Sequence, residues 1–176
     1  MAQTVYDPPV ATYIPLQTIT LGSAASSVTF ASIPQTYRDL VLVTSTKHSF
    51  AGSDGVRDNG LNFNSDTSST YSAVLMYGNG SSATSASQSV TNIQLLYGMA
   101  SSNFLPGVIS VMDYSATDKH KSILYRAGVG SDSNYGAYAL AGRWPSNAAV
   151  TSLSITPSGS YTILSGSTFS LYAIEA

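Results

Sequence analysis

Residue types that perform catalysis are scarce in this sequence. Only two histidines, His48 and His120, could act as a general base beside a serine nucleophile. With 31 serines, a Ser-His-Asp grouping can be drawn by chance, and no Gly-x-Ser-x-Gly segment marks one serine as the nucleophile. Glycoside cleavage relies on paired carboxylates that usually include Glu, whereas Glu175 next to the C-terminus is the only Glu. We therefore expect a protein that is not an enzyme.

Oxygen ligands of the kind that calcium binds gather between residues 54 and 66, without the spacing of an EF-hand. They are Asp54, Asp58, Asn62, Asn64 and Asp66. Asp58-Asn59-Gly60 is typical of a turn, which is the favoured interpretation, and a calcium-stabilised extracellular module is a weaker alternative. The two histidines are not spaced as zinc ligands, and no glycine-rich phosphate loop is present. We expect no metal and no cofactor.

Two other segments could contact a partner. The single tryptophan, Trp144, stands between Arg143 and Pro145. It could stack on a sugar or anchor a subunit contact, although Trp more often completes a core with its indole N–H bonded to a loop carbonyl. Lys119-His120-Lys121 is the only basic cluster, and a solvated hairpin tip is favoured over an anion site because three residues make a weak patch.

The first twelve residues differ from the rest of the chain. Asp7-Pro8-Pro9 cannot join a central strand and favours an extended polyproline conformation. The segment is either a frayed tail or an arm that lies across a neighbouring subunit, with Val5 and Tyr6 as anchors. It lacks the basic start and apolar run of a signal peptide. We predict an extended N-terminal arm over residues 1–12 and a single domain over residues 13–176.

Composition narrows the class of protein and of partner. Charged residues are 9% of the chain, the net charge is −2, and the seven basic residues are spread along its length, so nucleic acid is excluded as a partner. No apolar stretch reaches about 18 residues, so no membrane partner is expected. The absence of cysteine excludes disulfides, thiolate metal sites and a cysteine nucleophile. Because 43% of the residues are hydrophobic, the chain can build a core.

The elements that must position these residues are strands. Glu, Lys and Gln are scarce, and Gly, Pro or Ser clusters interrupt nearly every ten-residue window, which argues against helices. Turns are expected at residues 58–60, 78–80, 157–159 and 165–167, and a polar loop at residues 80–89. The pattern predicts an all-β fold, a β-sandwich of the jelly-roll type. The expected strands are residues 13–21, 28–31, 39–46, 61–64, 71–77, 90–97, 107–114, 122–129, 135–144, 150–156 and 168–174.

One segment resembles a known family. Residues 33–40 (IPQTYRDL), followed by residues 41–43 (VLV), resemble a motif of small virion proteins from tailed bacteriophages, cyanophages among them. In that group a segment like residues 16–23 (LQTITLGS) precedes the motif, and segments like residues 63–66 and 71–72 follow it.

The resemblance covers nearly the whole chain beyond Tyr13. Such proteins close with a strand like residues 167–174 (STFSLYAI), where Ala173 departs from the pattern because Gly is expected there. The resemblance implies a phage structural protein, either a capsid decoration protein or a tail or fibre module, and does not choose between them.

From the residues alone, the motif has a structural explanation. Pro34 fixes the backbone and extends the residue before it, Tyr37 packs at the start of the following strand, and Arg38 stays at the rim. A contact of Tyr37 or Arg38 with another subunit is the alternative, because Tyr and Arg are enriched at interfaces.

The resulting hypothesis is a non-enzymatic virion structural protein. We favour a capsid decoration (cement) protein that binds the major capsid protein or other virion proteins, in virions assembled in the host cytoplasm. A homo-oligomer is expected, with a trimer favoured because decoration proteins commonly trimerise. The alternative is a tail or fibre receptor-binding module that recognises host-surface glycans. The candidate interface residues are Val5, Tyr6, Pro8, Pro9, Tyr37, Arg38, Arg143 and Trp144.

Overall fold

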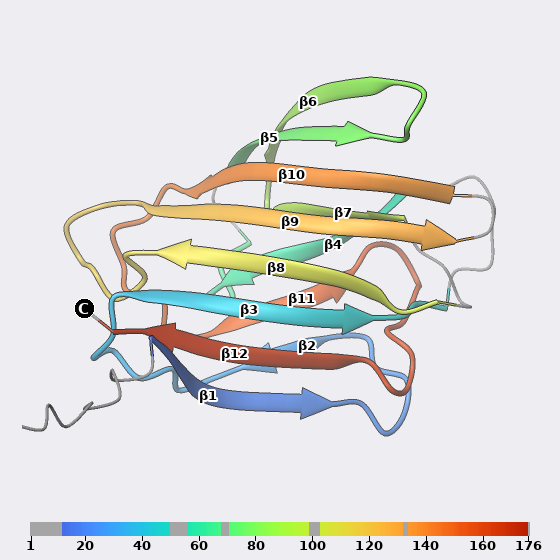
Figure 1. Ribbon diagram of the computed structural model, residues 1–176. Helices are drawn as coiled ribbons and strands as arrows, with labels where there is room; N and C mark the ends of the chain where they lie inside the picture. Colours follow the sequence, from blue (N-terminus) through green and yellow to red (C-terminus); the bar gives the residue numbers. More distant parts are fainter. Residues whose placement is uncertain (1–11, 50–55, 68–70, 99–102, 132–133, 176) are drawn as a thin grey trace, which may run out of the picture.

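The computed structural model describes residues 12–49, 56–67, 71–98, 103–131 and 134–175. In that part of the chain the protein consists of strands, arranged as a β-sandwich of two antiparallel sheets (Figure 1). The all-β prediction is therefore confirmed. No helix capable of crossing a membrane occurs among these residues. The predicted N-terminal arm lies outside the described residues, apart from Thr12.

The larger sheet has eight strands. Every neighbouring pair is antiparallel. In spatial order the strands are β1 (Tyr13–Thr20), β12 (Thr168–Ile174), β3 (Asp39–Thr46), β8 (Leu105–Met112), β9 (Lys121–Ser131), β10 (Asn134–Trp144), β5 (Tyr71–Gly78) and β6 (Ala83–Val90). The last strand of the chain, β12, lies in this sheet between β1 and β3.

The smaller sheet has four strands and covers one side of the larger one (Figure 1). In spatial order its strands are β2 (Val28–Phe30), β11 (Leu153–Pro157), β4 (Val56–Phe63) and β7 (Ile93–Gly98). The sheets approach closely where β10 crosses β7, because a Cβ added at Gly142 would meet Ile93 Cδ1 at 2.8 Å. Glycine at this position therefore permits the close packing of the two sheets.

The core lies between the two sheets and follows the period of two along each strand. In β8, Leu105, Ile109 and Val111 are buried with the facing residues of the small sheet, among them Leu61 and Leu153. Full burial of such a side chain contributes about 1.5–3 kcal/mol, so this layer supplies the main stabilisation of the fold.

Three local predictions are wrong. The predicted polar loop at residues 80–89 contains strand β6, which pairs with β5 without a register shift. The predicted turn Asp58-Asn59-Gly60 lies inside β4, where β11 and β7 pair with it on either side. The single strand expected at residues 90–97 is two strands, since β6 ends at Val90 and β7 begins at Ile93 in the other sheet. In each case pairing with neighbouring strands overrides local propensity.

The turn predicted at residues 78–80 is confirmed, and it joins β5 to β6. Asn79 Oδ1 accepts hydrogen bonds from the backbone N–H groups of Ser81 and Ser82, at 3.0 and 2.8 Å. Gly80 has a φ of 86°, which favours glycine. The Asx-type turn thus places β6 at one edge of the large sheet.

Candidate interaction surface

The large sheet has a second side, which the small sheet does not cover. Its central part consists of two rows of residues that the strand register places side by side, and we call it the outer face. One row is Val43, Val108, Arg126, Ala139, Met76 and Ser85, and the next is Val41, Ser110, Leu124, Ala141, Val74 and Ser87.

The outer face is apolar although much of it is open to solvent. Met76 is 59% exposed, Val74 55% and Leu124 47%, and Val43 is also exposed. Isolated exposed apolar side chains are normal on protein surfaces, but a contiguous patch marks an interaction site. The grouping of these four on one sheet face therefore makes it the candidate interaction surface.

Small side chains leave hollows in this face. One hollow of about 660 Å³ is bordered by Met76, Arg126 and Ala139 together with Ala83 and Ser85 of β6. A second, of about 470 Å³, lies along Val74, Val108 and Leu124. The hollows arise because alanine and serine alternate with larger residues along each row. A partner with protruding side chains would fit such a surface better than a flat one.

Two cations border the hollows. Arg126 lines the two hollows just described, and Arg143 lines a third of about 550 Å³ beside Val74 and Leu124. The two ion pairs within the described ranges are Arg38–Asp39 and Lys119–Asp113, so neither outer-face arginine has a carboxylate partner there. The surface is therefore apolar with a positive charge.

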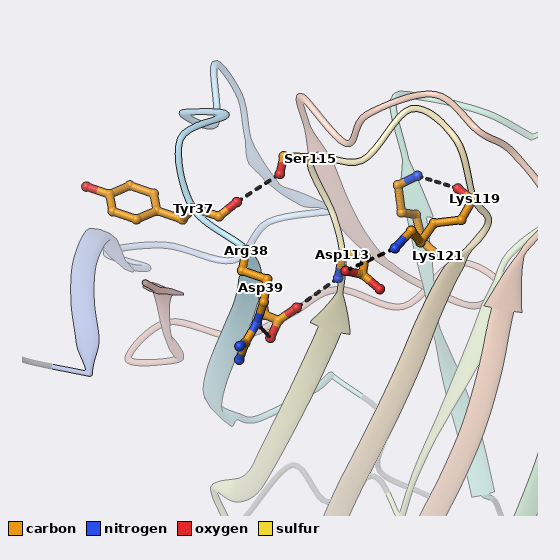
Figure 2. Close-up of polar contacts among 7 residues, drawn as sticks. All are labelled: Tyr37, Arg38, Asp39, Asp113, Ser115, Lys119 and Lys121. Carbon is orange, nitrogen blue, oxygen red and sulfur yellow. Dashed lines mark hydrogen bonds and ion pairs between the residues drawn. The ribbon is translucent and has the colours of Figure 1, made fainter. Parts of the chain in front are cut away.

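The residues of the IPQTYRDL segment hold the start of β3 to the loop after β8, as Figure 2 shows. Arg38 Nε donates to Asp39 Oδ2 at 2.8 Å, and Asp39 Oδ1 accepts the backbone N–H of Asp113 at 2.8 Å. Ser115 Oγ donates to the carbonyl oxygen of Tyr37 at 2.8 Å. The Tyr37 ring points away from these bonds (Figure 2) and packs partly against the core. These contacts fit the structural explanation of the motif, and a subunit contact by Tyr37 or Arg38 stays a prediction.

Trp144 does not belong to the surface, which corrects its assignment as an interface residue. It is 2% exposed and stacks on Tyr71 with ring centroids 6.4 Å apart. Its indole N–H donates to Asp66 Oδ2 at 2.8 Å, a carboxylate rather than the expected loop carbonyl. Burial raises the pKa of the neighbouring Tyr71 hydroxyl to about 12. Of the three alternatives for Trp144, the structure shows the core.

The oxygen-rich segment is used for turn structure. Asn64 Oδ1 accepts the backbone N–H groups of Thr151 and Ser152, while Asn62 Nδ2 donates to the carbonyl oxygens of Asp66 and Thr91. Asn64 itself has a φ of 52°, in the left-handed region. Asp54 and the side chain of Asp58 lie outside the described part. Within that part, no group of three or more His, Asp or Glu residues could hold a metal ion.

The two histidines have different surroundings. His48 is fully buried, with its Nε2 atom 3.3 Å from Asn59 Nδ2, and burial lowers its pKa to about 4. His120 is exposed, on the loop before β9. A buried histidine that stays neutral can contribute packing and hydrogen bonds to the interior, which is the role that its contacts support.

The basic cluster is only partly a solvated tip. Lys119 is exposed and pairs with Asp113 at 3.7 Å, but Lys121 is buried. Lys121 Nζ donates to the carbonyl oxygen of Lys119 at 2.8 Å, and burial lowers its pKa. The prediction of a solvated cluster is therefore wrong for Lys121. Its position explains the difference, since it begins β9 opposite Trp144 and takes the inward phase of the strand.

Of the predicted interface residues, only Arg143 lies beside the outer face. Tyr37 and Arg38 lie just before β3 begins, and Val5, Tyr6, Pro8 and Pro9 lie outside the described residues. Sequence reasoning missed the apolar outer face. The signal was present in residues 71–77 (YSAVLMY), where both phases of a strand carry apolar residues although only one phase faces the core.

No family model, no curated protein and no solved structure matches this chain.

Proposed function

We propose that this chain is a non-enzymatic structural protein of a phage virion, namely a capsid decoration (cement) protein that binds the major capsid protein as a homo-oligomer. The observation that carries the proposal is the outer face, an apolar surface of the large sheet with hollows and two arginines without described carboxylate partners. Such a surface supports binding to another protein more than it supports chemistry. The resemblance of residues 33–43 supplies the virion context.

The strand order supports the jelly-roll form of the sandwich. The chain alternates between sheets, with β2, β4, β7 and β11 in the small sheet and β3, β5, β6 and β8 in the large one. This interleaving supports a jelly roll with the hairpin β9–β10 inserted between β8 and β5, and with β12 and β1 added beyond β3. Jelly rolls serve both capsid proteins and lectins, so the fold alone does not assign the function.

The glycan-binding alternative loses its main support. It relied on exposed Trp144 and Tyr side chains in a concave site with Asp and Asn around them, and Trp144 is buried. The four large apolar residues named on the outer face are not aromatic, and the two tyrosines that line the 660 Å³ hollow, Tyr77 and Tyr138, stack on each other.

The test is the copy number of this chain in purified particles, measured by quantitative peptide mass spectrometry against the major capsid protein. Hundreds of copies per particle are expected for a decoration protein, on the order of the number of capsid subunits. About a dozen copies would overturn decoration in favour of a tail or fibre position. Absence from the particles would overturn the virion role altogether.

A further inference from the structure

We propose that the outer face is the docking surface for the N-terminal segment of a neighbouring copy of this chain, with Asp7 beside Arg126 and the Val5-Tyr6 pair in the adjoining hollows. The inference deepens the proposed function and rests on it in one respect, that copies of the chain meet in an assembly. Four observations lead to this occupant.

The first observation is the charge on the face. Any partner that covers Arg126 must supply an acceptor, because a guanidinium buried without one carries a large desolvation cost. If the outer faces of two copies packed against each other, their arginines would come together. Neither row contains a carboxylate that could pair with them. Asp7 has the only charged side chain among residues 1–37, so the side chains of the N-terminal segment bring a single, negative charge.

The second observation is the geometry of the hollows. They lie on a sheet face, where the backbone groups of the strands are already paired with neighbouring strands, so an occupant must be recognised through its side chains. Pro8 and Pro9 have no N–H donors to leave unsatisfied, and a polyproline conformation is extended before it binds, which lowers the entropy cost. Val5 and Tyr6 offer the protruding apolar side chains that the hollows near Met76 would accept.

The third observation is reach. Eleven residues precede Thr12, and an extended segment of that length spans up to roughly 36 Å. Neighbouring strands lie about 4.8 Å apart, so crossing from β1 to β10 within one large sheet takes about 24 Å. Asp7 stands five residues before Thr12 and can reach about 18 Å from it, so the proposed contact requires a neighbour whose Arg126 lies within that distance of Thr12.

The fourth observation concerns direction, and it favours a neighbour over the same copy. A chain that continues the line of β1 backwards from Tyr13 leaves the end of its own sheet, where Tyr13 pairs with Ile174. A return over its own outer face would need the chain to reverse between Thr12 and Asp7, where Pro8 and Pro9 favour an extended conformation. Exchange of such a segment between identical copies is a common, low-cost route to an oligomer.

The experiment is disulfide trapping with full-length protein. Because the natural chain has no cysteine, Val5→Cys and Met76→Cys each carry a single thiol. The two variants are mixed in equal amounts with oxidised glutathione, and mass spectrometry identifies the products. We expect the mixed Val5→Cys/Met76→Cys dimer to form at least about fivefold faster than the dimer with a control, Thr156→Cys, on the exposed side of the small sheet.

A charge exchange tests the ion pair. Asp7→Arg in the Val5→Cys chain is expected to slow trapping about fivefold, which corresponds to one partly exposed pair, and Arg126→Asp in the Met76→Cys chain is expected to restore it. The same Arg126→Asp change should leave trapping by Thr156→Cys unaffected.

Three results would overturn the proposal. They are equal trapping by Met76→Cys and Thr156→Cys, no restoration by the charge exchange, and closure within one chain when a dilute double variant carries both Val5→Cys and Met76→Cys. The trapping uses purified protein alone, so its failure is distinguishable from failure of the proposed function. Hundreds of copies per particle without trapping would remove the arm contact and leave the decoration role in place.

Discussion

The two faces of the large sheet are built from the same strands, one residue out of phase. The inner row Leu42, Ile109, Tyr125, Leu140 and Leu75 is almost completely buried. The adjacent outer row holds Val43, Val108, Arg126, Ala139 and Met76. Both rows are mainly apolar, but the inner one has large side chains that fill the space between the sheets, whereas small residues of the outer one leave hollows. Apolar character alone therefore does not place a residue in the core, and side-chain volume separates the two faces.

A matched pair of leucines is expected to show the largest difference between the two faces in the free energy of unfolding. Leu140 on β10 is 3% exposed, and Leu124 on the neighbouring strand β9 is 47% exposed. Leu140→Ala should lower the free energy of unfolding by about 2–5 kcal/mol, because it removes apolar contacts and leaves a cavity. Leu124→Ala should lower it by less than about 1 kcal/mol. Urea unfolding measures both, and equal losses would contradict the division into an inner and an outer face.

The second effect depends on pH and concerns the interior beyond the end of β3. Burial lowers the pKa of His48 from 6.5 to about 4, so the unfolded chain binds a proton there before the folded chain does. The free energy of unfolding should therefore fall as the pH drops from about 6.5 to about 4, by about 3 kcal/mol for this group, and the contribution should level off below pH 4. Urea unfolding of the wild type and of His48→Asn across this range measures the contribution.

The control for that prediction is the other histidine. His120→Gln, at an exposed position, should retain the dependence on pH, whereas His48→Asn should lose most of it. An unchanged slope in His48→Asn would show that other groups cause the loss of stability in acid.

Alanine substitutions of two glycines on neighbouring strands are expected to change the stability by smaller amounts, and in opposite directions. A Cβ at Gly142, on the inner face, would lie 2.8 Å from Ile93 Cδ1, whereas a Cβ at Gly128 would meet nothing within 4 Å. Gly142→Ala should destabilise the protein by about 1–3 kcal/mol through overpacking between the sheets. Gly128→Ala should stabilise it by up to about 1 kcal/mol, because alanine restricts the unfolded chain. Thermal unfolding of both variants checks the signs, and destabilisation by Gly128→Ala would place an unseen constraint on the outer face.

The smallest effect on stability is expected for Arg143, beside the outer face. Arg143→Ala should change the free energy of unfolding by less than about 0.5 kcal/mol, because the side chain is exposed and has no described ion-pair partner. Its neighbour Trp144 provides the comparison, since Trp144→Phe would remove the indole N–H that donates to Asp66 and cost about 1–3 kcal/mol. A large loss in Arg143→Ala would indicate a structural role for that guanidinium.

The sequence predicts the class of the fold because period-two patterns and turn residues are local properties. The strands at residues 39–46 and 168–174 match the structure at both ends. Residues 83–90 (ATSASQSV) lack that pattern. They form the edge strand β6, in which most side chains are exposed and need not be apolar. Its strand conformation comes from pairing with β5, a long-range property that local composition does not contain.

The surface was harder to predict than the fold. Lys121 and Arg143 both stand in sequence neighbourhoods that suggest exposure, yet the phase of β9 turns Lys121 inward and the phase of β10 turns Arg143 outward. Trp144 follows Arg143 directly and takes the opposite face. A strand that is one residue out of register would exchange these roles, so the candidate surface could be located only after the pairing was known.

The position of β12 has a consequence for how the protein is made. Its residues 168–174 leave the ribosome after every other strand of the described part, yet they pair with β1 on one side and β3 on the other. Strand β1 therefore stays without this neighbour until β12 has been synthesised, and folding that depends on such distant pairings is slow, in the range of milliseconds to seconds. Until β12 is made, the edge of β3 that it will cover stays unpaired. When many ribosomes translate this chain close together, that edge would favour strand exchange between nascent copies.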